Sequence, residues 1–367
     1  LDRSGTPIDI IFEDGNYANI SLGFVDPNIT GSDIAGNDVS NVGNDFTILG
    51  GGIKLDFGGP ISVALIYDEP YGSDILWRGS RSGTLLGGTK ADAESDGLTV
   101  LVKYQVTDRI SAYGGPRVAS AKGEIVLGGL GFTPTVLSAT NPDLNGYTAT
   151  FGSSTGVGAV LGAAYEIPDI AFRASLTWHS SIDLDMRTTE AFPSSNFGGA
   201  PLGSGVTGAA TTTGTTQVEL PQTIKLALQS GINRNTLVFG SVRWADWEEF
   251  SLIPPRLQSN LATLDNAFTY EIGIGRRVTN RLSTSISYTL DDSDGDHLVS
   301  PLAPTDGSQA ISLGAKYTLT DTIDISAGIR YTWLGDATPE IGTPDTPLAK
   351  FKDNDAVSAG LNLGIHF

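Results

Sequence analysis

Histidine, serine and acidic side chains are the groups in this chain that could take part in catalysis. The chain has three histidines, His179, His297 and His366, and no cysteine. Hydrolysis by an activated serine or by a histidine–carboxylate pair needs these groups within hydrogen-bonding distance, and no spacing in the sequence singles out such a set. The sequence therefore predicts that the protein is not an enzyme.

An acidic segment is the candidate for metal binding. Residues 291–296 read Asp-Asp-Ser-Asp-Gly-Asp, which supplies oxygen ligands of the kind that Ca²⁺ takes. The segment lacks the glutamate of the twelfth position of an EF-hand loop, which favours a solvated loop. Without cysteine, neither thiolate metal sites nor disulfides are available. We therefore expect no metal and no other cofactor.

Cationic side chains are stronger candidates for binding a ligand. Arg117, Arg243 and Arg330 each follow a predicted tight turn by about eight residues, which places them at a common depth if the turns share one end. A guanidinium binds a carboxylate through two parallel hydrogen bonds. Whether these arginines can do so depends on the elements that carry them.

Those elements are strands with alternating faces. Between residues 322 and 334, apolar side chains such as Ile325 and Trp333 alternate with polar ones such as Ser326 and Arg330, and successive side chains of a strand point to opposite faces. The same pattern predicts fourteen strands, near residues 17–27, 44–57, 61–70, 97–106, 110–122, 147–166, 170–183, 217–230, 235–249, 267–277, 282–291, 308–319, 322–334 and 354–367.

The connections between these strands are alternately short and long. The short ones carry the Gly, Pro, Asn and Asp expected of tight turns: Gly58-Gly59-Pro60, Thr107-Asp108-Arg109, Pro168-Asp169, Ile232-Asn233-Arg234, Thr279-Asn280 and Thr320-Asp321. The long ones lie near 28–43, 71–96, 123–146, 184–216, 250–266, 292–307 and 335–353. A bacterial outer-membrane barrel has short periplasmic turns, long external loops and an even strand number. The sequence therefore predicts an all-β, transmembrane antiparallel up-and-down β-barrel of fourteen strands, in preference to a soluble all-β protein.

Composition agrees with this fold and excludes one class of partner. The formal net charge is −19, so a general basic surface for nucleic acid is not expected. The partners expected of such a barrel are outer-membrane lipid and lipopolysaccharide, and we expect a monomer.

The predicted inner face carries cations beside apolar groups. Taking the apolar phase as lipid-facing places these cations inside the barrel: Lys54, Lys103, Arg117, Arg173, Lys225, Arg243, Lys316 and Arg330. They could pair with inward acids such as Asp324 and Glu271, or Arg117, Arg243 and Arg330 could bind an anionic head group. The apolar residues Phe46, Ile48, Leu237, Phe239 and Trp247 also fall on the inward phase. These apolar residues could line a binding site for an amphiphile with an acid head group. They could equally pack against the N-terminal segment.

The two ends of the chain have distinct expected roles. Residues 1–16 are too short for a domain and are predicted to form a plug, and residues 17–367 form the barrel. The chain begins at Leu1 without Met, as in a mature or trimmed form. The last strand ends on Phe367, should pair with the strand near 17–27 to close the wall, and would place both termini on the periplasmic side. A C-terminal aromatic also resembles the signal that the barrel-assembly machinery reads.

Several local motifs resemble the FadL/TodX family of outer-membrane transporters for long-chain fatty acids and other hydrophobic molecules. The segment Ala64-Leu65-Ile66-Tyr67-Asp68-Glu69-Pro70-Tyr71-Gly72 is similar to the third strand of the family and its exit. Leu220-Pro221-Gln222, followed by Trp244-Ala245-Asp246-Trp247-Glu248-Glu249-Phe250, is similar to its eighth and ninth strands. Ser300-Pro301 and the terminal strand also fit. The Asn-Pro-Ala motif of a long N-terminal hatch is missing.

The resemblance implies passive transport without ATP or metal. Substrate would bind first in an apolar site between external loops, here Val126, Leu127, Leu130 and Phe132 within Ile125 to Leu137. It would then enter a lumen pocket with Arg117, Arg243, Arg330, Phe46, Ile48, Phe239 and Trp247, and leave sideways through a gap at a kink in the third strand, at Asp68, Glu69, Pro70, Tyr71 and Gly72. The alternatives are a narrow general or anion-preferring porin, and an adhesive barrel whose loops bind partners.

Overall fold

The computed structural model describes the chain except for residues 1, 4, 135, 137–142, 194–209, 263, 293–296 and 343–345. Its main sheet closes on itself, because β1 (Tyr17–Asn28) pairs with both β23 (Asn354–His366) and β4 (Phe46–Asp56). The result is a closed antiparallel barrel of fourteen strands, which confirms the predicted fold class. No helix among the described residues is long and apolar enough to span a membrane.

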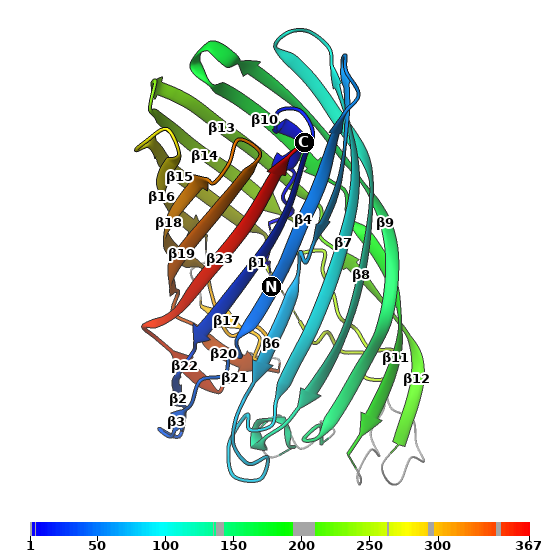
Figure 1. The fold of residues 1–367 in the computed structure, drawn as a ribbon. Helices are drawn as coiled ribbons and strands as arrows, with labels where there is room; N and C mark the ends of the chain where they lie inside the picture. The colour runs from blue at the N-terminus through cyan, green and yellow to red at the C-terminus, as the bar shows by residue number, and fades with distance from the viewer. Residues whose placement is uncertain are drawn as a thin grey trace.

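Three of the fourteen barrel strands are interrupted, so that each consists of two segments: β5 (Ile61–Asp68) and β6 (Gly72–Leu76), β10 (Phe172–His179) and β11 (Ile182–Phe192), and β12 (Ala210–Leu220) and β13 (Thr223–Asn233). The remaining barrel strands are β7 (Lys90–Gln105), β8 (Ile110–Leu127), β9 (Tyr147–Ile167), β14 (Thr236–Ala245), β15 (Ala267–Arg277), β16 (Leu282–Asp291), β18 (Ser308–Thr318) and β19 (Ile323–Leu334). Figure 1 shows them tilted around one barrel, with the short turns gathered at the top.

Small elements occupy the connections. The loop strands are β2 (Gly31–Asp33), β3 (Asp38–Val39), β17 (Leu298–Val299), β20 (Thr338–Ile341), β21 (Thr346–Pro347) and β22 (Ala349–Phe351). The 3-10 helices are η1 (Asp9–Phe12), η2 (Leu130–Phe132) and η3 (Pro168–Ile170). Apolar loop residues form a buried cluster at the long-loop end, where the rings of Trp77 and Phe351 lie 5.3 Å apart.

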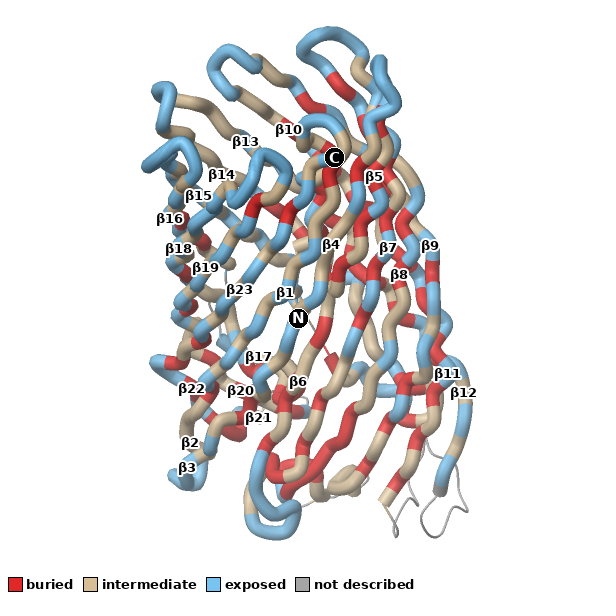
Figure 2. Tube along the Cα trace, in the orientation of Figure 1, coloured by how far each residue is buried: buried red, intermediate tan, exposed pale blue. Residues whose placement is uncertain are grey.

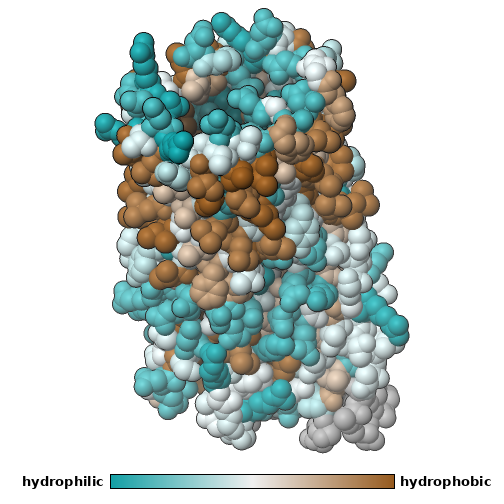
Figure 3. All heavy atoms as spheres, viewed as in Figure 1, coloured by the Kyte–Doolittle hydropathy of each residue, from teal (hydrophilic) through white to brown (hydrophobic). Residues whose placement is uncertain are grey.

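The alternation of side chains explains why these segments become strands of a barrel in lipid. Buried or half-buried positions alternate with exposed ones along most strands (Figure 2). The exposed set is apolar: Ile272 on β15 is 68% exposed and Leu361 on β23 is 60% exposed. On the face shown in Figure 3, such groups gather in a belt across the half of the barrel nearer the short turns. Burying each CH₂ is worth about 0.8 kcal/mol, so this belt favours a lipid environment.

The last strand closes the wall as predicted. β23 pairs with β1 from Tyr17↔His366 to Asn28↔Asp355, and the Asn19 side-chain amide donates to the Asn362 side-chain oxygen at 2.8 Å. The Phe367 N–H donates to the Asn16 carbonyl oxygen at 3.1 Å. The backbone N–H and C=O groups at the seam therefore find hydrogen-bond partners, as a closed barrel in lipid requires.

Several predicted strand ends were wrong on the long-loop side. The strand expected to begin near residue 97 begins at Lys90, the one expected to end near 122 ends at Leu127, and the strands expected near 170–183 and 217–230 extend to Phe192 and Ala210. Beyond the apolar belt the outward face can be polar, so these extensions lack the outward apolar residues that mark a lipid-facing strand; along β11 the apolar Ile182, Leu184 and Met186 are buried instead. Lys122 and Glu94 illustrate this, because their side chains pair at 2.9 Å with both exposed.

Two strand interruptions were also missed. The strands expected near 170–183 and 217–230 break, and β14 ends at Ala245 rather than near 249, whereas the break after Asp68 coincides with the predicted kink of the third strand. Odd-numbered side chains are buried up to His179, and even-numbered side chains are buried from Ile182 onward. The break at Ser180-Ser181 therefore shifts the inward face by one residue. A uniform alternation cannot anticipate such a shift.

Candidate functional site

The N-terminal segment lies inside the barrel and packs on one side of the lumen. Ile8 and Ile11 belong to a buried cluster with Ala64, Ile66 and Leu101 of β5 and β7. The Phe12 ring lies under the Arg173 guanidinium, at 4.3 Å, and 5.4 Å from the Lys103 ammonium. These cation–π contacts explain two of the inward cations as supports of the segment.

A third inward cation anchors the same segment. The Lys54 ammonium is buried and donates hydrogen bonds to the carbonyl oxygens of Glu13 at 2.6 Å and Gly15 at 3.0 Å. These contacts hold the turn that leads into β1. The residues before η1 extend away from this turn toward the middle of the barrel, where the N-terminal label lies in Figure 1.

The wall of the barrel is broken where the third strand is interrupted. β5 pairs with β7 up to Asp68↔Gly97, and β6 resumes at Gly72↔Glu94. Three residues, Glu69 to Tyr71, therefore face two residues of β7, so one residue is surplus and the ladder is disrupted. The Ser95 hydroxyl bridges the defect by accepting from the Tyr71 N–H at 2.9 Å and donating to the Tyr71 carbonyl at 2.8 Å.

The break is wider on the side of β4. Backbone pairing of β4 with β5 ends at Gly51↔Tyr67, and the described residues show no ladder between β4 and β6. In place of a backbone partner, the Leu49 N–H donates to the Glu69 carboxylate at 3.1 Å. The predicted kink at Asp68 to Gly72 thus coincides with a stretch of wall that lacks its main-chain hydrogen bonds.

The first residues of the chain fill this break. Asp2 forms an isolated antiparallel bridge with Tyr71, and the Arg3 N–H donates to the Pro70 carbonyl oxygen at 2.8 Å. The Arg3 guanidinium lies 4.3 Å from the centroid of the Phe46 ring and against Gly72, where an added Cβ would meet it at 2.3 Å. Asp2 and Arg3 therefore replace part of the missing wall.

Two of the predicted arginines lie near this break, and each is paired with an acid. The buried Arg117 guanidinium donates to both oxygens of Asp68 at 3.0 Å and to the Thr99 hydroxyl at 3.0 Å. The Arg243 guanidinium lies 2.5 Å from the Asp2 carboxylate. Removing one partner of a buried ion pair costs about 3–5 kcal/mol, so the Arg117–Asp68 pair fixes the end of β5.

The remaining predicted lumen residues are spread over several places. Trp247 lies beyond the end of β14, with its ring 5.2 Å from that of Tyr71. Arg330 is on β19, where its Nε lies 3.4 Å from the Thr332 hydroxyl. Phe46 and Trp247 thus join Arg117 and Arg243 at the break, whereas Arg330 is not brought into this group.

Two of the cavities bordered by the described residues lie in the lumen. One of about 550 Å³ lies beside the N-terminal segment and is lined by Ile48, Ile66 and Asp68 among others. A second of about 570 Å³ lies toward the short-turn end and is lined by Phe239 among others. Ser326 and Ala327 of β19 line both cavities, so the two spaces meet at that strand.

The predicted loop site is packed. Leu127 and Phe132 belong to the buried loop-end cluster, Val126 is also buried, and Leu130 is 37% exposed. Leu137 and most of the acidic segment 291–296 lie outside the described residues. Within the described part of the chain, no group of three or more His, Asp or Glu side chains is placed to hold a metal ion.

Sequence reasoning missed the residues that fill the break. Asp2 and Arg3 belong to a segment whose apolar residues follow no clear strand or helix period. Their partners Arg243 and Pro70 are remote in sequence. The excess of one residue between Asp68 and Gly72 was likewise invisible, because it appears only in the register with β7. The Glu-Pro pair at 69–70 is the only local signal of the break, since proline cannot donate to a ladder.

Comparisons with known proteins agree with this geometry. A family model described as outer membrane protein transport protein (OMPP1/FadL/TodX) matches residues 53–367. A solved Pseudomonas aeruginosa FadL homologue is 16% identical, with a TM-score of 0.77 and coverage of 98% of this chain and 92% of that chain. The Pseudomonas putida toluene transporter TodX is 16% identical, with a TM-score of 0.69 and coverage of 97% and 91%. No curated protein sequence matches the chain.

Proposed function

Because the chain belongs to the outer membrane protein transport family (OMPP1/FadL/TodX), we propose that it carries hydrophobic molecules across the outer membrane, with long-chain fatty acids as the principal class. The observation that carries this proposal is the break in the wall at Asp68 to Gly72, which is filled by Asp2 and Arg3 rather than by a strand. Displacing these two residues would join the lumen to the lipid beside it.

The surface around the break suits a lateral exit. Leu49 and Leu65, each 41% exposed on the outer face, flank the point where the pairing of β4 with β5 ends. A fatty acid that moved from the lumen to lipid here would stay in apolar surroundings, which saves about 0.8 kcal/mol for each CH₂ kept from water. An axial exit would expose the whole alkyl chain to the periplasm.

The route to the break begins at the loops. Val126, Leu127, Leu130 and Phe132 would form the first apolar site when the loop-end cluster opens, and the cavity beside Ile48 would take the chain next. We propose that the long loops face outward and that the short-turn end, where β1 begins and β23 ends, is periplasmic; the expected periplasmic position of the N-terminus does not hold, because Asp2 and Arg3 lie at the wall break. The barrel is taken to act as a monomer, embedded among lipid and lipopolysaccharide after insertion by the barrel-assembly machinery.

Arg243 is the proposed receptor for an acid head group. Its present partner is the carboxylate of Asp2, which is the same chemical group as the head of a fatty acid. An incoming carboxylate would therefore compete with Asp2 for the guanidinium, and its success would detach Asp2 from Arg243 beside Tyr71. Arg117 is engaged by Asp68 and would serve mainly to hold the edge of the break.

Opposite effects are expected from substitutions of this pair. Asp2→Asn removes the competing charge and should tighten binding of a long-chain fatty acid about tenfold, which corresponds to about 1.4 kcal/mol. Arg243→Gln should weaken it by a similar factor. Titration with a fatty acid and with the alcohol of equal chain length separates the head from the tail, since the alcohol should bind all three proteins alike. Equal fatty-acid affinities in all three would remove Arg243 from the site.

Uptake and conductance together test the proposed function against a porin. Cells that produce the protein should take up a long-chain fatty acid faster than cells without it, and the purified protein in planar bilayers should give no steady large current. Lys54 holds the N-terminal segment at Glu13 and Gly15, and we expect this segment, which takes up one side of the lumen, to restrict the flow of ions. A steady large current without fatty-acid uptake would contradict the transporter and favour the porin.

A further inference from the structure

Four arginines lie close together at the short-turn end of the barrel and are called the basic arc here: Arg234, Arg276, Arg277 and Arg281. The first lies in the turn between β13 and β14, the middle two end β15, and the last lies in the turn between β15 and β16. Thr236 of β14 pairs with Arg276, and the Arg277 N–H donates to the Asn235 carbonyl oxygen at 2.8 Å. Because neighbouring strands lie about 4.8 Å apart, the basic arc covers one short stretch of the rim.

The basic arc differs in charge from the rest of the chain. The whole chain has 41 acidic and 22 basic residues, yet the sequence holds no Asp or Glu between 220 and 245 or between 272 and 290. All four arginines are exposed, and no ion pair of theirs is found among the described residues. Lys316, the next cation along the wall, is paired with Asp324 at 3.2 Å. The described part of the chain thus supplies no counter-ion to these four positive charges.

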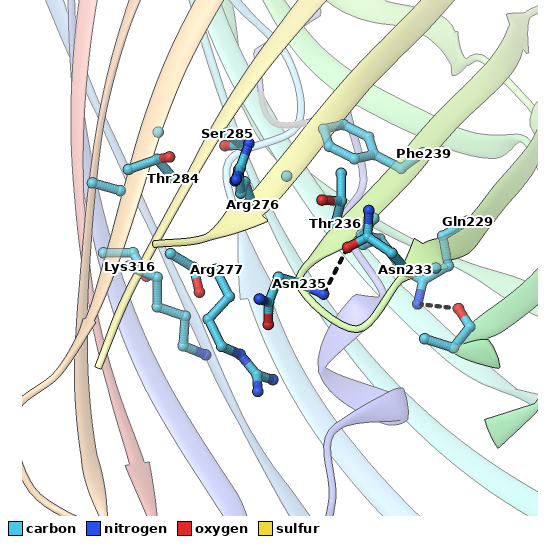
Figure 4. A pocket seen from close by; sticks show the side chains of 18 of the residues that line it. Gln229, Asn233, Asn235, Thr236, Phe239, Arg276, Arg277, Thr284, Ser285 and Lys316 are labelled. Carbon is cyan, nitrogen blue, oxygen red and sulfur yellow. Dashed lines mark hydrogen bonds between the residues drawn. The ribbon is translucent and has the colours of Figure 1, made fainter. Parts of the chain in front are cut away.

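The basic arc borders the lipid-facing surface. Ile232 and Val278, which lie in or beside the same two turns, are 60% and 55% exposed. Arg276 continues the outward phase of β15. Figure 4 shows the Arg277 side chain extending away from Phe239, toward the level of the β13–β14 turn. Long basic side chains at such a boundary lay their alkyl stems on apolar surface and hold the charge in the polar layer, so these guanidinium groups reach the level of lipid head groups.

Other short turns lack this excess of cations. The turn between β7 and β8 holds Arg109 beside Asp108, so its charges offset each other. The turn between β18 and β19 holds Asp321, and η3 holds Asp169, each without a cation. The positive charge of the rim is therefore concentrated beside β13 to β16, where it attracts ions of the opposite sign.

We propose that the basic arc binds the phosphate head groups of anionic phospholipids in the leaflet at the short-turn end. Arginine suits this partner because its planar guanidinium donates two parallel hydrogen bonds to phosphate oxygens, and clustered cations beside a membrane-spanning wall favour anionic lipid. The ammonium of phosphatidylethanolamine is repelled by unpaired guanidinium groups, so a head group such as phosphatidylglycerol is preferred. Its acyl chains pack on Ile232 and Val278. This surface requires the barrel to lie in a bilayer, but it depends neither on the substrate nor on lateral exit.

Displacement of a fluorescent phosphatidylglycerol from the folded protein in non-ionic detergent micelles tests the surface. The competitors are unlabelled phosphatidylglycerol, phosphatidylethanolamine with the same acyl chains, and inorganic phosphate. Phosphatidylglycerol should compete at least about tenfold more tightly than either of the others, because it alone joins a net anionic head to an apolar body. Its affinity should fall as salt is raised. Equal competition by phosphatidylethanolamine would overturn the preference for anionic lipid, and equal competition by inorganic phosphate would overturn the assignment to lipid.

A triple variant locates the binding on the basic arc. Arg234→Gln with Arg276→Gln and Arg281→Gln should weaken phosphatidylglycerol about tenfold or more, since three of the four guanidinium groups are lost. Competition by phosphatidylethanolamine should stay as in the parent protein. Fatty-acid uptake should also be unaffected, because the wall break lies on other strands. The proposal fails if the triple variant binds phosphatidylglycerol like the parent protein.

The matched control removes three exposed cations on the long-loop side, through Arg187→Gln with Lys350→Gln and Lys352→Gln. It changes the net charge of the protein as much as the triple variant does, but it leaves the basic arc intact. Phosphatidylglycerol should bind this control as tightly as the parent protein. A loss as large as that of the triple variant would show that net charge, and not the basic arc, attracts the lipid.

Discussion

Deletion of Pro70 should reduce uptake of a long-chain fatty acid to nearly the level of cells that lack the protein. The deletion leaves two residues between Asp68 and Gly72, which equals the two residues, Ser95 and Asp96, that face them on β7. The ladder with β7 can then run without a bulge, so we expect the third strand to lie flat along β7 and the proposed exit to narrow. An added barrier of only about 1.4 kcal/mol already slows a step tenfold.

The substitution Pro70→Ala is the matched control for this deletion. It removes the proline ring but keeps three residues opposite two, so the register defect of the third strand remains. Its uptake should stay within about twofold of the parent protein, a change of under 1 kcal/mol. Uptake of the deletion variant at the parental rate, with the barrel folded and inserted, would show that the break is not the exit.

Much of the fold could be predicted because lipid imposes a strict rule on the wall. A side chain such as Ile272 or Leu361 must be apolar where it faces lipid, so alternation marks each strand, and the contrast of short turns with long loops marks the two ends. This rule applies only to the part of the wall that faces lipid. The extension of β7 from Lys90 to Asp96 alternates charged with small residues, and nothing in that pattern required a strand.

The candidate site was harder to predict because it depends on register and on distant partners. The inward phase of Arg117 and Arg243 follows from alternation, but their pairing with Asp68 and Asp2 needs the barrel to be closed.

A reversible lock of the N-terminal segment should block transport almost completely. Asp2 and Tyr71 form an antiparallel bridge, and residues paired in this way have Cα atoms about 4.5–5.5 Å apart, within the range that a disulfide spans. The chain has no cysteine, so Asp2→Cys with Tyr71→Cys introduces a single possible crosslink. Oxidation would tie the segment across the break and keep the wall filled.

Two controls separate the lock from other effects of these substitutions. Each single-cysteine variant should transport equally with and without reductant, because no partner thiol is available within the chain. A second crosslink that leaves the break free can be placed at Ser21→Cys with Asn362→Cys, whose residues face each other across the seam of β1 and β23. This seam crosslink should leave uptake unchanged, since the seam stays closed during lateral exit.

The rate of fatty-acid uptake by the Asp2→Cys/Tyr71→Cys protein, measured in the oxidised and then in the reduced state, tests lateral exit most directly. We expect background uptake after oxidation and recovery of most of the parental rate after reduction, because only the contact of the N-terminal segment with the third strand changes between the two states. Equal, substantial uptake in both states would contradict transport through the break at Asp68 to Gly72.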